Sequence, residues 1–363
     1  NIDKITVLST TYMNEQGKTD LLVQSLKLIS QAAIEILNIP NGYEESNMFA
    51  IQEMILNWAN QHPAKDRFIF NITGGTKLMS IAMDRASMLL GSARAESFYQ
   101  SRGQHVVWYQ RQTNQIVYPI NSNLNLQQRV LSRGYQITKQ QPITDISLEQ
   151  LRYAQILIDV MKNDFQKGRR FCSFINKLAS MSDDENSLNV HFDNIQAEQA
   201  EGLEVLAQIT QEAFFSFDST SSVIQFKSEE TREYMKGGWL EVYSGYECYK
   251  ALIGLNPQAE LAINVELKKK DTPNEMDVMF IHHAHLYCIE CKTAKTMAHE
   301  QAKDVLYKLS SLQDFGGINQ KQAVVSLYSL KDYNLTRANN SEIRIFQERD
   351  LLNLSQLISE WLQ

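Results

Sequence analysis

Two short apolar stretches separated by a polar tetrapeptide constrain the fold of this chain more than any other feature. Asp277 opens the apolar run 278–281, the polar residues 282–285 follow, and a second apolar stretch covers 286–293. Runs of this length joined by a polar turn predict a β-hairpin. We expect Asp277 at the start of the first strand.

The second predicted strand carries Glu290 and Lys292. Successive side chains of a strand point to opposite faces, so these two share one face. Burying a charged pair without partners is costly, which favours a chemical role over a purely structural ion pair. Two carboxylates can hold Mg²⁺ or Mn²⁺, and a nearby ammonium can neutralise charge on a phosphate. The motif Asp277…Glu290-x-Lys292 therefore indicates metal-dependent phosphodiester hydrolysis and resembles that of PD-(D/E)xK nucleases.

Residues 1–125 alternate strands and helices, which predicts a Rossmann-like α/β domain with a largely parallel sheet. We expect strands at 4–9, 67–71, 95–99, 106–110 and 116–120. Helices are expected in three places: a helix carrying Leu22, Leu26, Ile29, Ala33 and Leu37, a helix carrying Met48, Ile51, Ile55 and Trp58, and a helix over 78–90.

A glycine-rich turn, Thr73-Gly74-Gly75-Thr76-Lys77, joins one of these strands to the helix that begins at Leu78. Backbone N–H groups at a helix amino end favour anions, and a hydroxyl and an ammonium add further phosphate contacts. The Gly-x-x-x-x-Gly-Lys-Ser/Thr motif of P-loops is absent, and a Gly-Gly turn is equally compatible with a structural role. We expect the loop 9–14 to lie at the same sheet edge.

Residues 126–235 are predicted to form a connector, either winged-helix-like or a plain helical linker. Helices are expected at 148–161, 171–181 and 198–215, with a strand at 222–226. Residues 236–363 are predicted to form an α/β domain containing the hairpin. Its further elements are helices at 239–253, 305–312 and 351–362, strands at 261–267, 323–327 and 343–346, and a turn with Lys268, Lys269 and Lys270 that can contact a phosphate backbone or only solvent.

Composition limits the classes of protein. The net charge of −7 argues against a protein coated with basic surface for nucleic acid, although an enzyme needs only a local basic groove. No apolar run spans a membrane and no secretory signal opens the chain, so we expect a cytoplasmic protein. The first residue is Asn, so we expect a longer natural chain. The four cysteines, Cys172, Cys248, Cys288 and Cys291, are expected to be reduced core residues, and His282, His283 and His285 a polar hairpin tip.

Three landmarks occur together along the chain: Phe70–Lys77, then Gly237-Gly238-Trp239-Leu240-Glu241, then Asn274–Asp277 with Ile289–Thr293. Tyr307-Lys308-Leu309 and Asp314-Phe315-Gly316-Gly317 continue the pattern. In these landmarks the chain resembles the CARF-domain nucleases associated with type III CRISPR systems. The resemblance covers nearly the whole sequence. It implies a CARF domain (1–125), a small connector (126–235) and a PD-(D/E)xK nuclease domain (236–363).

The resemblance further implies an antiviral endonuclease that cuts DNA, RNA or both with Mn²⁺ or Mg²⁺. Cyclic tetra-adenylate would activate it by binding across the two-fold axis of a homodimer. The implied ligand contacts are Thr10, Thr11, Thr73, Gly74, Gly75, Thr76 and Lys77. The implied metal ligands are Asp277, Glu290 and Glu241, with Lys292 as the catalytic lysine. Glu275 is a weaker candidate, and Tyr307 and Lys308 are implied substrate contacts. Such CARF domains usually begin with a strand and helix before the element that opens here at Ile5.

Two other functions remain open on the sequence. One is a regulator in which a CARF sensor and a winged helix bind DNA without cutting it. The other is a Rossmann-type metabolic enzyme that binds a nucleotide, although the Gly-x-Gly-x-x-Gly turn is absent. A metal-dependent cleavage assay separates the first from a nuclease, and ligand-induced stabilisation separates the second.

Overall fold

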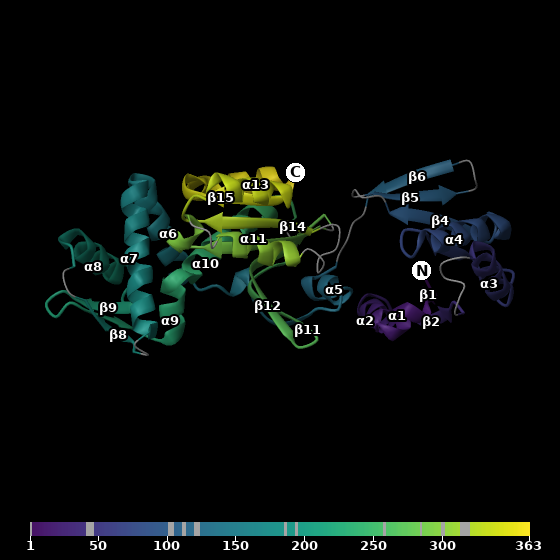
Figure 1. Cartoon of the computed structure of the whole chain (residues 1–363), viewed down its shortest axis with the longest axis horizontal. Helices are drawn as coiled ribbons and strands as arrows, with labels where there is room; N and C mark the ends of the chain where they lie inside the picture. Colours follow the sequence, from purple (N-terminus) through teal and green to yellow (C-terminus); the bar gives the residue numbers. More distant parts are fainter. Residues whose placement is uncertain are drawn as a thin grey trace. The chain divides into compact units, whose positions relative to one another are not determined.

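The computed structural model describes residues 2–40, 47–100, 105–110, 114–119, 124–184, 187–192, 195–256, 259–283, 285–298, 302–312 and 320–363 (Figure 1). The chain divides into two compact units, Asn1–Gly134 and Tyr135–Gln363. Each unit has its own core. Within the described residues, no helix combines the length and the apolar character needed to cross a membrane.

The first unit contains two sets of paired strands. Strand β1 (Lys4–Ser9) lies parallel to β2 (Ala33–Asn38), and β3 (Phe68–Asn71) lies parallel to β4 (Ala95–Gln100). Strands β5 (His105–Gln110) and β6 (Asn114–Pro119) extend the second set in antiparallel fashion. The α/β class is confirmed, but the sheet is less parallel than predicted. In the described residues, β1 and β3 belong to different sheets, so the expectation of one shared sheet edge is wrong.

The described residues of this unit also form the helices α1 (Thr11–Glu15), α2 (Lys18–Ile29), α3 (Met48–Asn60), α4 (Lys77–Leu90) and α5 (Leu126–Leu131). The predicted single helix from Leu22 to Leu37 is wrong, since α2 ends at Ile29 and β2 follows. The β-branched residues Ile34 and Ile36 favour a strand there. Helices α3 and α4 pack together, and Ile51, Ile55, Met79 and Ala82 form the centre of this unit's core.

The second unit is organised around a six-stranded sheet. Its order is β15 (Ile343–Gln347), β14 (Gln320–Ser326), β13 (His285–Lys292), β12 (Thr272–His282), β11 (Leu261–Lys269) and β7 (Gln136–Pro142). The strands from β7 to β13 are antiparallel, and β13, β14 and β15 are parallel. Helices α11 (Ala302–Ser311) and α13 (Asp332–Asn340) supply the two crossovers that parallel pairs require. The sequence did not predict α13, whose Asn-rich composition gives a weak helical pattern.

Helix α10 (Trp239–Ile253) lies where the sequence placed it. It contacts β11, β12 and β13, as well as α6 (Leu148–Asn163) and α14 (Leu354–Leu362). Its residues Trp239, Leu240, Cys248 and Leu252 are fully buried. A helix that is apolar on nearly all sides is typical of a buried position, so α10 joins the sheet and the outer helices into one core.

The middle of the chain shares that core. Helix α7 (Phe165–Asp184) is longer than predicted, and β8 (Asn189–His191), β10 (Val223–Phe226) and β9 (Phe215–Asp218) form a three-stranded antiparallel sheet. The helix predicted to end at Phe215 is shorter: α8 runs from Ala197 to Ile209. Buried side chains of α6 and α7 belong to the same cluster as those of α10 and β13. The division into three domains inferred from the sequence remains a prediction.

A wide helical turn connects this middle region to α10. Helix α9 (Glu229–Glu233) continues into the π-helix η2 (Tyr234–Gly238), and α10 starts at the next residue. Near α7 in Figure 1, the chain passes from α9 into α10. The first turn of α10 therefore continues directly from the last residue of η2.

Candidate active site

Three charged side chains meet at the junction of β12 and β13. The antiparallel register pairs Val278 with Ile289, which places Asp277 beside Glu290. The Lys292 ammonium lies 2.7 Å from Glu290 Oε1 and 3.6 Å from Asp277 Oδ2. The backbone N–H of Cys291 donates to Asp277 Oδ2 at 2.5 Å. The predicted hairpin thus brings the three motif residues together.

The position of Asp277 along its strand differs from the prediction. Strand β12 begins at Thr272, so Asp277 lies in its middle and not at its start. The preceding residues pair with β11, which extends the strand beyond the apolar run. Asp277 and Glu290 are buried, at 7% and 3% exposure.

A second lysine, Lys308, pairs with the Glu290 carboxylate. Lys308 Nζ lies 2.9 Å from each oxygen of Glu290. Lys308 belongs to α11, whose buried residues Leu306 and Leu309 pack on the core and hold the helix in place. The resemblance implied a substrate contact for Lys308, whereas the geometry makes it a direct partner of a motif carboxylate.

Glu241 is the third carboxylate of the cluster. It stands in the first turn of α10 and is half-buried. Burial, followed by repulsion from Asp277, raises the pKa of Glu241 well above that of an ordinary glutamate. The Glu241 carboxyl therefore lies close enough to the hairpin to interact with its charges.

The same crowding affects the hairpin residues. Burial and the Glu290 carboxylate raise the pKa of Asp277. Burial lowers the pKa of Lys292, but the attraction of Asp277 and Glu290 outweighs it and the net pKa is raised. Lys292 is therefore a charged ammonium at neutral pH, held between carboxylates that repel one another.

The donor set fits a hard divalent cation. Carboxylate oxygens are the ligands that Mg²⁺ and Mn²⁺ prefer. A cation would stabilise the ionised carboxylates of Asp277 and Glu241, whose pKa values are raised first by burial and then by repulsion from neighbouring carboxylates. In the described part of the chain, no three carboxyl, imidazole or thiol groups already converge as a preformed metal cluster. The Glu290 oxygens face Lys292 and Lys308 instead.

Other candidates lie around this cluster. Glu275 is exposed and pairs across the strands with Glu266, although its charge contributes to the raised pKa of Glu241. Tyr307 is 57% exposed, and the Arg337 guanidinium of α13 lies 4.9 Å from its ring. Of the lysine run, Lys268 pairs with Asp271 at 3.5 Å and Lys269 lies 4.6 Å from the Tyr135 ring. The Asp314–Gly317 landmark lies outside the described residues.

The histidine prediction is partly wrong. His282 is a buried strand residue paired with His285 and not part of an exposed tip. Burial, together with the charges of His283 and His285, lowers the pKa of His282 to about 4. The four cysteines are free and buried, as expected.

In the first unit, the glycine-rich turn lies between β3 and α4. Residues 73–77 are all exposed, and Gly75 has a φ of +87°, a conformation that favours glycine. Thr76 caps α4 by accepting from Met79 N at 3.3 Å, and Thr73 Oγ1 accepts from Gln100 N at 2.8 Å. Gly74 and the exposed Lys77 complete the loop.

The second predicted ligand segment follows β1. Thr10 is buried and caps α1, since its side chain accepts from Met13 N at 3.1 Å. Thr11 is the first residue of α1 and half-buried. The two segments thus stand at the carboxyl ends of parallel strands in separate sheets, which is a weaker basis for one shared crevice than the sequence suggested.

The fold and the charged hairpin together have the features of a metal-dependent nuclease domain that is joined to a second α/β unit. Two family models match the chain. Residues 1–131 match the Card1 CARF domain, and residues 228–363 match the Card1-like endonuclease domain. The chain belongs to the CARF-domain nucleases.

Solved structures share this fold at low sequence identity. Protein VC1899 from Vibrio cholerae is 18% identical, with a TM-score of 0.83 over 99% of this chain and 91% of that one. Can2 from Sulfobacillus thermosulfidooxidans, solved with cyclic tetra-adenylate, is 19% identical, with a TM-score of 0.78 over 99% and 93%. A type III CRISPR defence DNA nuclease activated by cyclic oligoadenylate is 13% identical, with a TM-score of 0.53 over 92% and 43%. A search of curated proteins found no match.

Proposed function

We propose that this chain is an endonuclease of type III CRISPR defence that cyclic tetra-adenylate activates and that cuts DNA, RNA or both. The observation that supports this proposal most strongly is the Asp277–Glu290–Lys292 cluster, in which two buried carboxylates and an ammonium meet on adjacent strands of an endonuclease domain. Burial and the charge of Glu290 raise the pKa of the Asp277 carboxyl, and carboxylates perturbed in this way are typical of functional sites. The structural similarity to Can2 with its bound cyclic tetra-adenylate supports the choice of activator.

In this proposal Asp277, Glu290 and Glu241 hold a divalent cation. Mg²⁺ or Mn²⁺ bound there would act as a Lewis acid on the scissile phosphate and lower the pKa of a water molecule. Lys292 neutralises negative charge that develops on the phosphate, because its ammonium lies between two motif carboxylates and stays protonated. Lys308 fixes the orientation of Glu290, and the exposed ring of Tyr307 offers a surface on which a base can stack.

The activator is proposed to bind the CARF domain at the loop 73–77 and at Thr10 and Thr11. Backbone N–H groups at the start of α4 and the Lys77 ammonium suit phosphate groups. A ring of repeated nucleotides suits a homodimer that presents the same loop twice. Activation requires that the ligand binds one arrangement of the dimer more tightly than the other.

The test is cleavage of labelled single-stranded RNA, single-stranded DNA and supercoiled plasmid with Mn²⁺, with and without cyclic tetra-adenylate. The proposal expects ligand-dependent cutting that stops on chelation of the metal. Equal cutting with and without ligand contradicts the activation step but leaves the nuclease. A shift of DNA mobility without cutting would instead support the regulator.

A further inference from the structure

Helix α7 touches two chain segments that adjoin candidate catalytic residues. One is the π-helix η2, which leads directly into α10 and its Glu241. The other is the end of β13, where Thr293 follows Lys292. Single π-turns inside helices are frequent at functional sites, and their wide backbone needs external hydrogen-bond partners. Here α7 supplies them.

The side chain that makes this contact is Asn176. Its amide orientation is assigned from the surrounding donors and acceptors. In the orientation that satisfies them, the amide nitrogen lies 3.1 Å from the carbonyl oxygens of both Met235 and Lys236. It also lies 3.2 Å from Cys172 O, and the amide oxygen accepts from Thr293 Oγ1 at 2.9 Å. One half-buried side chain thus joins η2, the end of β13 and α7.

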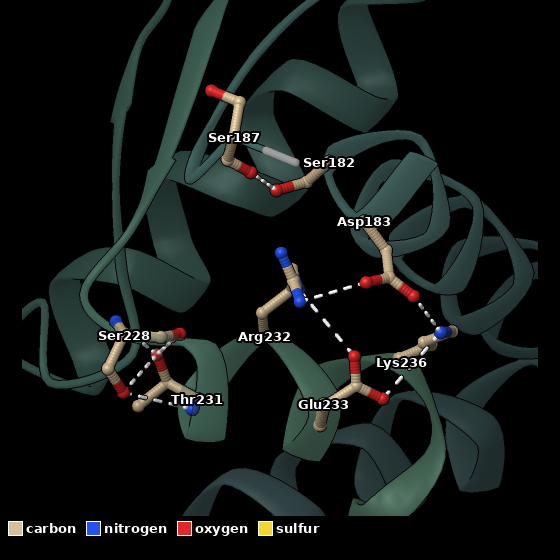
Figure 2. A network of polar contacts seen from close by, with 8 residues as sticks. All are labelled: Ser182, Asp183, Ser187, Ser228, Thr231, Arg232, Glu233 and Lys236. Atoms are coloured by element: carbon tan, nitrogen blue, oxygen red, sulfur yellow. Dashed lines mark hydrogen bonds and ion pairs between the residues drawn. The ribbon is translucent and has the colours of Figure 1, made fainter. Parts of the chain in front are cut away.

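A second anchor lies two helical turns further along α7. Asp183 follows Asn176 by seven residues, so both point to one face of the helix. Asp183 accepts from Arg232 Nη2 at 2.9 Å and from Lys236 Nζ at 2.6 Å. Glu233 closes the network at 3.6 Å from each cation, as Figure 2 shows. The hydrogen bond from Lys236 lowers the pKa of Asp183, so the anchor is ionised at neutral pH.

The π-helix and the end of β13 also approach each other closely. A Cβ atom at Gly237 would lie 3.2 Å from Thr293 Oγ1, which leaves little room for a larger residue. Leu327 N donates to Lys292 O at 3.0 Å and holds the other side of that strand end. The position of Lys292 is therefore fixed from β14 and from α7.

We propose that Asn176 is a positioning residue that locks the segments carrying Glu241 and Lys292 to α7, with Asp183 as its outer support. This inference rests on the proposed nuclease function. Asn176 does not touch the substrate and acts only through the geometry of the metal ligands and the lysine. Such supporting hydrogen bonds typically change metal affinity or activity by about 10- to 100-fold.

The test compares Asn176→Asp with wild type in the whole chain. Aspartate keeps the size but turns an acceptor toward three carbonyl oxygens. We expect kcat to fall about 10- to 100-fold while KM for the nucleic acid changes less than about twofold. Mn²⁺ affinity, measured without substrate from the electron paramagnetic resonance of free Mn²⁺, should fall about tenfold. All measurements are made well below the melting temperature of each variant.

Two further variants make the result decisive. Thr293→Val keeps the shape of the side chain and removes only the hydroxyl that Asn176 binds, so it should show the same changes if Asn176→Asp does not fold. Lys177→Ala changes the exposed neighbouring residue of α7 and should leave kcat and Mn²⁺ affinity unchanged.

Folded variants with lower melting temperatures but wild-type kcat and Mn²⁺ affinity would overturn the proposal, since a merely structural residue predicts that result. Failure of the proposed function looks different. In that case the wild type itself neither cuts nucleic acid nor binds Mn²⁺, and the positioning role of Asn176 is contradicted as well.

Discussion

The two candidate sites of this chain are built in opposite ways. The turn 73–77 of the CARF domain is exposed, and hydrogen bonds between side chains and backbone hold it. The nuclease cluster buries Asp277 and Glu290 and neutralises them with Lys292 and Lys308. An exposed turn tolerates substitution with a graded loss of affinity, whereas removing one partner from a buried charge network leaves the others uncompensated. The following variants test this difference.

The largest expected effect comes from Glu290→Gln. The amide keeps the size but loses the charge that faces Lys292 and Lys308 and that we assign to the metal. We expect cleavage to fall by about 10³-fold or more, since a catalytic metal is worth several kcal/mol of transition-state stabilisation. Glu275→Gln, at an exposed position two residues before Asp277, is the matched control and should retain most activity. Near-normal cutting by Glu290→Gln would remove Glu290 from the site.

A smaller effect is expected from Lys308→Met, which frees both Glu290 oxygens from one ammonium but leaves Lys292 in place. We expect about a tenfold fall in kcat, because a charge-assisted hydrogen bond contributes about 1.5–3 kcal/mol and part of it is replaced by Lys292. Steady-state kinetics measure the effect. Lys303→Met on the same helix serves as the control, and equal losses in both variants would point to a helix defect.

The CARF loop should respond differently. Lys77→Ala removes an exposed ammonium at the start of α4. We expect about tenfold more cyclic tetra-adenylate to be needed for half-maximal activation, with the same maximal rate, since tenfold corresponds to about 1.4 kcal/mol. The exposed Lys27→Ala is the control. A lower maximal rate that excess activator does not restore would break the contrast between the two sites.

The smallest effect concerns stability and pH. The pKa of His282 is lowered to about 4, so the folded state favours neutral imidazole. Unfolding lets His282 take up a proton below its ordinary value of about 6.5. The contribution of neutral His282 to the free energy of unfolding is therefore complete above pH 6.5. It is lost as the pH falls toward 4, which lowers the free energy of unfolding by at most about 3 kcal/mol. Urea melts at several pH values should show a flatter profile for His282→Gln. The exposed His191→Gln should leave the wild-type slope, and an unchanged slope in His282→Gln contradicts this assignment.

Local sequence patterns predicted the catalytic hairpin well. The run 278–281 and the stretch 286–293 form adjacent strands, and the alternation of side chains places Glu290 and Lys292 together. The start of β12 was misplaced because Thr272–Met276 pair with β11, which is a tertiary contact and not a hydrophobic pattern. The place of Lys308 beside Glu290 depends on how α11 packs, so spacing along the chain could not reveal it.

The CARF half was harder to predict. Strand β2 was mistaken for the continuation of α2, because Ala33 and Leu37 also fit a helical spacing. The sheet edges of β1 and β3 were expected to coincide, but strand pairing is decided by distant segments. Asn176 carries no sequence signature at all, since its role arises only from the carbonyl groups that the π-helix turns toward α7.

The central claim is that activator bound to the CARF domain controls the metal site of the nuclease domain. The most direct test measures cleavage of labelled single-stranded RNA and single-stranded DNA while cyclic tetra-adenylate is titrated at fixed Mn²⁺, with Glu290→Gln alongside. We predict cutting that rises from near zero to saturation with the activator and is absent in Glu290→Gln. Cutting that is independent of the activator, or that persists in Glu290→Gln, would contradict the account.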